Sequence, residues 1–171
     1  MQKKALPTLL LIATLGVIAS HLDWSANENG HLLLIDNRPI DLVGLANNAW
    51  VRLSRNCSSV SVMSKDGPQF QQSIDLIKSY SPPDSNSAKV ASLIGADNWS
   101  LAEVEFDSLL PAVVLIKRVD KELAIVPNGI WSGYTKPWES APYIRNYLTT
   151  QVPGVPRHLT DCFEPSSQSF K

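Results

Sequence analysis

Residues 87–127 read SAKVASLIGADNWSLAEVEFDSLLPAVVLIKRVDKELAIVP, and this stretch decides the fold. It holds four short runs rich in Val, Ile, Leu and Ala, namely SAKVASLI, WSLAEVEF, PAVVLIKRV and ELAIVP. Turn-prone segments at 95–98, 107–110 and 120–121 separate the four runs. Strand-length apolar runs joined by a few turn residues are typical of an antiparallel meander. We therefore expect a sheet built from about residues 87–127.

Helical periodicity appears on both sides of this stretch. Residues 42–55 place six apolar side chains on one helical face, and residues 67–80 place four on another. The two sets are Leu42, Leu45, Ala46, Ala49, Trp50 and Leu53, then Phe70, Ile74, Ile77 and Tyr80. A third helix begins near Glu139 or Pro142. The sequence predicts an α+β class, with two or three helices packed on the meander and the first two on the same face.

The order of these elements resembles that of cone-shaped α+β folds such as the NTF2-like and cystatin-like groups. The resemblance lies in the order of helices and strands alone, because no motif accompanies it. It implies that a pocket can form between the sheet and the helices.

The N-terminus has the pattern of a targeting segment. Lys3 and Lys4 precede an almost wholly apolar run over residues 5–19. This pattern predicts a signal peptide cleaved after Ala19, or else a short uncleaved anchor in the inner membrane. The remaining chain is then periplasmic or secreted. We expect a linker over residues 20–30, a single α+β domain over 31–165 and a flexible tail over 166–171.

The two cysteines and the net charge restrict the kind of partner. Cys57 and Cys162 both lie in the part that would be exported, where an isolated pair most often forms a structural disulfide. The net charge is -1 for the whole chain and becomes more negative once residues 1–19 are removed. Because nucleic-acid binding needs a basic surface, we expect no nucleic-acid partner. Another envelope or exported protein fits better, with membrane contact only through an uncleaved N-terminal segment.

Three carboxylates recur at every second position of one expected strand. Glu103, Glu105 and Asp107 would therefore share one face of that strand. Such a row can bind a hard cation such as calcium. A solvated outer face, paired with Lys117 and Arg118 on the next strand, is the favoured interpretation.

An aromatic segment follows the last expected strand. Residues 131–138 read WSGYTKPW, and we expect them to form the loop between the final strand and the final helix. Exposed Trp and Tyr side chains are typical of protein contact sites, so this loop is the candidate partner-binding surface. Its candidate residues are Trp131, Tyr134, Lys136 and Trp138. In the favoured alternative, the two tryptophans instead fold inward and close the core.

Motifs for catalysis are sparse. The three histidines, His21, His31 and His158, lack metal-ligand spacing, and the sequence contains no HExxH, GxSxG, Walker or GxGxxG motif. We assign no catalytic, metal or cofactor-binding residue. The first hypothesis is an exported non-catalytic interaction protein of the cell envelope, either an immunity-type inhibitor or a secretion-system accessory subunit. A small-ligand carrier with a pocket between sheet and helices is second, and a hydrolase is third because paired carboxylates need not be close in sequence.

Overall fold

The computed structural model describes residues 19–170, and contacts divide the chain into two units at the Ala46–Asn47 boundary. The first unit contains a small antiparallel sheet of order β1-β2-β3. Its strands are β1 (Leu22–Asn27), β2 (Gly30–Ile35) and β3 (Arg38–Ile40). The turn between β2 and β3 uses Asp36 and Asn37 at positive φ, which these two residue types tolerate well.

Strand β1 lies where the sequence predicts a linker over residues 20–30. It pairs with β2 along its whole length, from Leu22 opposite Ile35 to Asn27 opposite Gly30. The strand is largely exposed, so backbone pairing rather than burial of its side chains holds it in place. Its residues LDWSAN do alternate between apolar and polar, which is the pattern of a strand, so the prediction of a linker there overlooked a signal that the sequence carries.

Helix α2 (Leu42–Ser54) continues from the first unit into the second. Its first turn is capped by Asp41, whose Oδ1 accepts a 2.7 Å hydrogen bond from the backbone N–H of Gly44. Aspartate is favoured there because its carboxylate satisfies an N–H group that the helix itself leaves without a partner.

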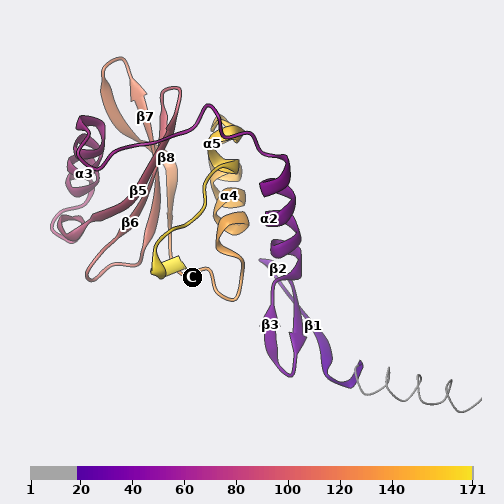
Figure 1. Ribbon diagram of the computed structural model, residues 1–171. Coiled ribbons are helices and arrows are strands. Elements are labelled where there is room, and N and C mark those ends of the chain that lie inside the picture. Colours follow the sequence, from indigo (N-terminus) through magenta and orange to yellow (C-terminus); the bar gives the residue numbers. More distant parts are fainter. Residues whose placement is uncertain (1–18, 171) are drawn as a thin grey trace, which may run out of the picture. The chain divides into compact units, whose positions relative to one another are not determined.

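The second unit is built on a five-stranded antiparallel sheet of order β4-β5-β6-β7-β8 (Figure 1). The strands are β4 (Ser61–Val62), β5 (Lys89–Ala96), β6 (Trp99–Glu105), β7 (Ala112–Val119) and β8 (Glu122–Ser132). Strands β5 to β8 follow one another in space as they do in sequence. The predicted meander and the α+β class are therefore confirmed.

The last strand runs further than the sequence predicts. Pro127 does not end β8, which bulges between Ile125, paired with Ile116, and Ile130, paired with Val114. Asn128 lies at positive φ within this bulge. An ideal Cβ on Gly129 would lie 3.0 Å from the Cβ of Leu115, so the close approach of the two strands favours glycine there.

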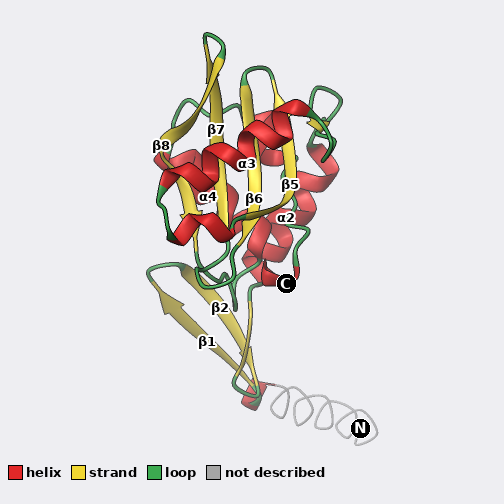
Figure 2. Cartoon of the chain, turned by 90° about the vertical axis from the view of Figure 1, so that its left-hand side faces the viewer, coloured by secondary structure: helices red, strands yellow, loops and turns green. Residues whose placement is uncertain are grey.

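Helices cover both faces of the five-stranded sheet (Figures 1 and 2). Helix α3 (Pro68–Tyr80) buries Phe70 and Ile77 against one face. Helices α4 (Ser140–Gln151) and α5 (Arg157–Asp161) cover the other. Because both sides are covered, every residue of β6 from Trp99 to Val104 is buried.

The expectation that residues 42–55 pack beside α3 on the sheet is wrong. The half of α2 within the second unit contacts α4 and the C-terminal segment, since Asn48 accepts a 3.0 Å hydrogen bond from Arg145 of α4. Trp50 and Leu53, which the sequence places on the apolar face, are exposed. The periodicity correctly finds the stripe, but the buried side of this helix is its polar one.

The segment after Cys162 packs against the core of the second unit. Phe163 and Phe170 are both buried in the core on the α4 side of the sheet, and a short 3-10 turn spans Gln168–Phe170. The sequence predicts a flexible tail over 166–171, whereas residues 166–170 pack against the rest of the second unit. The sequence misses this because a short polar stretch with one aromatic carries no periodic signal.

Cys57 and Cys162 form a disulfide with a Cα–Cα distance of 5.8 Å, as the sequence predicts. The bond joins residues 105 positions apart and indicates an oxidising, extracellular-type compartment. Within residues 19–170, no helix has the length and apolar character needed to cross a bilayer. The targeting segment predicted over residues 1–19 lies almost wholly outside the described residues.

Candidate functional site

An apolar pocket of about 320 Å³ lies between α3 and one end of the five-stranded sheet. Strands β7 and β8 form its floor, the end of α3 forms one wall, and the loop 106–111 forms another. The lining residues are Ile77, Tyr80, Ser81, Ser85, Phe106, Leu109, Leu110, Ala112, Val114, Ile125, Ile130 and Ser132. Ala112 contributes a small side chain to the floor, which leaves room above the sheet.

The wall at the end of α3 is fixed by local hydrogen bonds. Ser81, Pro82 and Pro83 follow the helix, and proline cannot continue it. The Oγ of Ser85 accepts a 3.1 Å bond from the N–H of Ser81 and donates a 2.6 Å bond to the carbonyl of Lys78. These bonds tie the 3-10 turn Asp84–Ser87 to the helix end, so the wall is built in advance of any ligand.

The rim of the pocket is apolar and exposed. Tyr80, Leu109 and Leu110 are 62%, 42% and 48% exposed. The lining offers aliphatic and aromatic surface together with the hydroxyl groups of Tyr80 and three serines. Such a surface gains free energy by burying an apolar group, at about 25 cal/mol for each Å² removed from water. The chemistry of this lining suits the binding of an apolar group.

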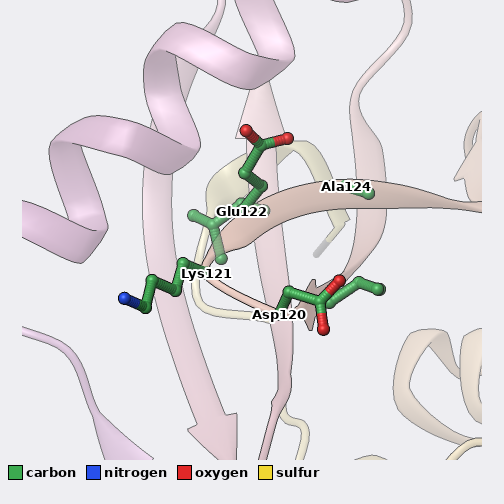
Figure 3. Close-up of a pocket in the computed structure, with 6 residues that line it drawn as sticks. Asp120, Lys121, Glu122 and Ala124 are labelled. Carbon is green, nitrogen blue, oxygen red and sulfur yellow. The ribbon is translucent and has the colours of Figure 1, made fainter.

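A second, larger hollow of about 550 Å³ lies at the tip of the β7–β8 hairpin. It is lined by Val119, Asp120, Lys121, Glu122, Leu123 and Ala124, which are consecutive residues of one hairpin. Figure 3 shows the charged side chains of Asp120, Lys121 and Glu122 pointing in different directions. Because no other element closes this hollow and its charges do not converge, the smaller apolar pocket is the better candidate site.

The aromatic segment does not gather its four candidate residues on one surface. Trp131 lies within β8 and is buried, with its ring centroid 5.6 Å from that of Phe170. Trp138 is half-buried and stacks on Tyr143 at 6.5 Å. Tyr134 and Lys136 remain exposed. The inward packing of Trp131 agrees with the favoured alternative, while partner binding by Tyr134 and Lys136 stays a prediction.

Of the three carboxylates in the row, only Asp107 is solvated, and it lies beyond the end of β6. Glu103 is fully buried, because the C-terminal segment covers this side of the sheet. Its carboxylate accepts hydrogen bonds from four groups: the N–H and hydroxyl of Ser166 at 3.0 and 2.7 Å, the N–H of Ser167 at 2.8 Å and the hydroxyl of Ser92 at 3.0 Å. Donors on all sides stabilise an anion and exclude a cation. The predicted pairing with Lys117 and Arg118 is not what Glu103 makes.

The other two carboxylates of the row have separate partners. Glu105 accepts a 3.0 Å hydrogen bond from the hydroxyl of Ser169, and Asp107 pairs with Lys89 at 2.6 Å. In the described part of the chain, no three His, Cys, Asp or Glu side chains are grouped as a metal site would require. Trp99 and Leu101 share the face of Glu103, and these apolar neighbours are the sequence signal that this face is buried.

Three arginines converge on Glu164, which the sequence does not single out. Arg52 and Arg55 contact its carboxylate at 2.8 and 2.7 Å, and Arg145 at 2.9 Å. Burial opposes ionisation of Glu164, but the hydrogen bond from Arg52 and the charge of Arg145 outweigh it and lower the pKa to about 2. Burial lowers the pKa of Arg145 in turn. The cluster links α2, α4 and the C-terminal segment within the second unit.

No protein-family model, no curated protein and no solved structure matches this chain. The resemblance to NTF2-like or cystatin-like folds therefore stays a prediction.

Proposed function

We propose that the chain is an exported, non-catalytic interaction protein of the cell envelope, and that its apolar pocket receives a large apolar side chain of a protein partner. The observation that carries the proposal is the half-open pocket whose rim residues Tyr80, Leu109 and Leu110 are exposed. Contact hot spots are typically pockets of this kind, ringed by surface that excludes water when the partner binds. The exposed rim would itself be buried in such a contact.

Export is the second part of the proposal. The Cys57–Cys162 bond supports it, because disulfides form and persist mainly in oxidising compartments. The basic and apolar pattern of residues 1–19 supports signal-directed transfer to the periplasm or beyond. The partner would then be another envelope or exported protein. An immunity-type inhibitor would have a toxin as its partner, whereas an accessory subunit would have a secretion-system component.

The test is a photo-crosslinking experiment in the native host, with a benzoylphenylalanine placed at Tyr80 of the full chain. We expect a covalent protein adduct whose second component is identified by mass spectrometry. Adding Leu110→Glu should abolish the adduct, because it places a charge on the pocket rim. Val119→Glu is the matched control, since Val119 is similarly exposed and lies at the opposite end of β7. No adduct at Tyr80, or an adduct insensitive to Leu110→Glu, would contradict the proposal.

A second crosslinking position, Tyr134, tests whether the partner instead binds the aromatic segment. Its side chain is 68% exposed and lies outside the pocket. An adduct formed at Tyr134 but not at Tyr80 would place the partner on the aromatic segment.

A small-ligand carrier is the second candidate, and the position and size of the pocket favour it. The pocket lies between sheet and helix, and about 320 Å³ reaches the lower end of the range of small-ligand sites, roughly 300–1,000 Å³. Native mass spectrometry of the purified full chain separates the candidates. A carrier should retain an apolar small molecule that is lost in Leu110→Glu, and its Tyr80 position should yield no protein adduct.

A further inference from the structure

Helix α2 carries an apolar stripe that faces solvent. Six residues form the stripe, at positions 42, 45, 46, 49, 50 and 53 of one continuous helix (Figure 1). Leu42, Leu45, Trp50 and Leu53 are among the large exposed apolar side chains, and the last two are 72% and 85% exposed. Ala46 and Ala49 are exposed as well. Large apolar side chains aligned on one exposed helical face mark a contact surface.

The stripe has the same pattern when read in either direction. Leu42 and Leu53 are equally far from the point between Asn47 and Asn48, and so are Leu45 and Trp50, and Ala46 and Ala49. An identical helix laid antiparallel would therefore set Leu42 against Leu53, Leu45 against Trp50 and Ala46 against Ala49. The steps of four, three and four residues from 42 to 46, 49 and 53 are those of a helix-pairing seam.

We propose that α2 pairs with α2 of a second copy of this chain, antiparallel and about a two-fold axis next to Asn47 and Asn48. A two-fold interface uses the same patch on both copies, so that patch must be complementary to itself. The stripe on α2 meets this condition. The alanines at the centre permit close approach of the two helices, and the larger side chains pack on either side of them.

The size of the stripe fits a weak dimer. An aromatic side chain buries about 150–250 Å². With the exposed fractions of Trp50 and the three leucines, the stripe offers on the order of 500 Å² per copy. Two copies would bury at most about 1,000 Å², which is the least area expected of a specific interface. The dimer should accordingly dissociate on dilution.

Crosslinking of single-cysteine variants tests the antiparallel register, since both native cysteines are held in the disulfide. The full chain is made as Leu42→Cys and as Leu53→Cys, and each is treated with a short bismaleimide alone and after mixing. In the antiparallel pair, residue 42 of one copy faces residue 53 of the other. Two copies of residue 53 lie about 16 Å apart, eleven residues at 1.5 Å each. We expect a crosslinked dimer in the mixture at least about fivefold above either variant alone.

Equal crosslinking of each variant alone would indicate a parallel pair, and no excess in the mixture would indicate no pairing. Either outcome overturns the proposal.

Sedimentation of the full chain over a range of concentrations tests the dimer itself. Leu53→Glu should weaken self-association about tenfold or more, because a charge would be buried opposite Leu42 of the second copy. Val62→Glu is the matched control, as Val62 is 79% exposed on β4 and lies outside the stripe. If Leu53→Glu left self-association unchanged, another segment of the chain would be responsible for it. A monomer that binds anionic phospholipid vesicles through Leu53 would assign the stripe to a lipid surface. Both results refute the helix pair.

Discussion

Replacing Glu103 with Gln should release the C-terminal segment from the sheet. The wild-type carboxylate is fully buried and accepts hydrogen bonds from Ser92, Ser166 and Ser167. A hydrogen bond to a charged group contributes about 1.5–3 kcal/mol. Glutamine has nearly the same shape, but an NH2 group in place of Oε1 would face the backbone N–H groups of Ser166 and Ser167, so both hydrogen bonds to that atom would be lost.

The net cost follows from these terms. Two lost charge-assisted bonds would cost about 3–6 kcal/mol, and the avoided burial of a charge offsets part of this. We expect about 3 kcal/mol of lost stability. For a domain of roughly this size, 1 kcal/mol shifts the melting temperature by about 2–4 °C, so the expected drop is about 6–12 °C at pH 7.

The assay combines melting with a local report from the tail. Trp131 packs against Phe170, so release of the tail should change tryptophan emission and open residues 163–170 to carboxypeptidase. Glu105→Gln is the matched control on the same strand, because Glu105 accepts a single side-chain hydrogen bond from Ser169 and is only half-buried. A Glu103→Gln protein that melts like wild type with a protected tail would refute the reasoning.

The pH dependence supplies a second readout for Glu103. Burial raises the pKa of this carboxyl, but the hydrogen bonds from Ser166 and Ser167 outweigh it and leave the pKa below 4.5. A lowered folded pKa means that the stability is present above pH 4.5 and is lost as the pH falls through the folded value. Glu103→Gln should therefore be less sensitive to acid than wild type.

Three further predictions concern the disulfide, the arginine cluster and the aromatic segment. Denatured, unreduced protein should show no free thiol in a thiol assay, and reduction of Cys57–Cys162 should lower stability in urea by up to about 4–5 kcal/mol. Two reactive thiols per chain would contradict this. Glu164 should contribute about 3 kcal/mol of stability above pH 4.5 that is lost as the pH falls toward 2, and Glu164→Gln should remove that acid transition in a pH series of melts. Trp131→Ala should cost about 3–5 kcal/mol, whereas Tyr134→Ala should leave unfolding within about 0.5 kcal/mol of wild type. Equal losses for the two aromatics would show that Trp131 is not a core residue.

The meander is predictable from sequence because its signals are local. Each strand pairs with the next through a short turn such as Asp97-Asn98 or Asp120-Lys121, so neighbours in sequence are neighbours in space. Apolar runs and turn residues together are sufficient for that inference. The disulfide is predictable for a different reason, since two cysteines allow one intramolecular pairing.

The sequence does not predict which other segment of the chain packs over a given helix or strand. The stripe of α2 is correctly found, but periodicity does not say whether a partner lies within the same chain, and Trp50 and Leu53 are exposed. Alternation on β6 correctly places Glu103 on one face, but not the C-terminal segment that covers that face. The pocket depends on Leu109 and Leu110 after β6 and on Tyr80 at the end of α3, which are about 30 residues apart in sequence. No short-range pattern joins them.

The C-terminal segment and the pocket lie on opposite faces of the sheet, and this separates structural support from the proposed function. Cys162 binds Cys57, Ser166 and Ser167 bind Glu103, and Phe170 packs on Trp131. All of these contacts lie on the side of α4, whereas Tyr80 and Leu110 line the pocket on the side of α3. The contacts of the tail join segments far apart in sequence and include a titratable carboxylate and a reducible disulfide, so we expect acid or reduction to open them before the meander. Opening the tail should therefore leave the pocket in place, and crosslinking from Tyr80 should persist in Glu103→Gln at a temperature where the sheet is still folded.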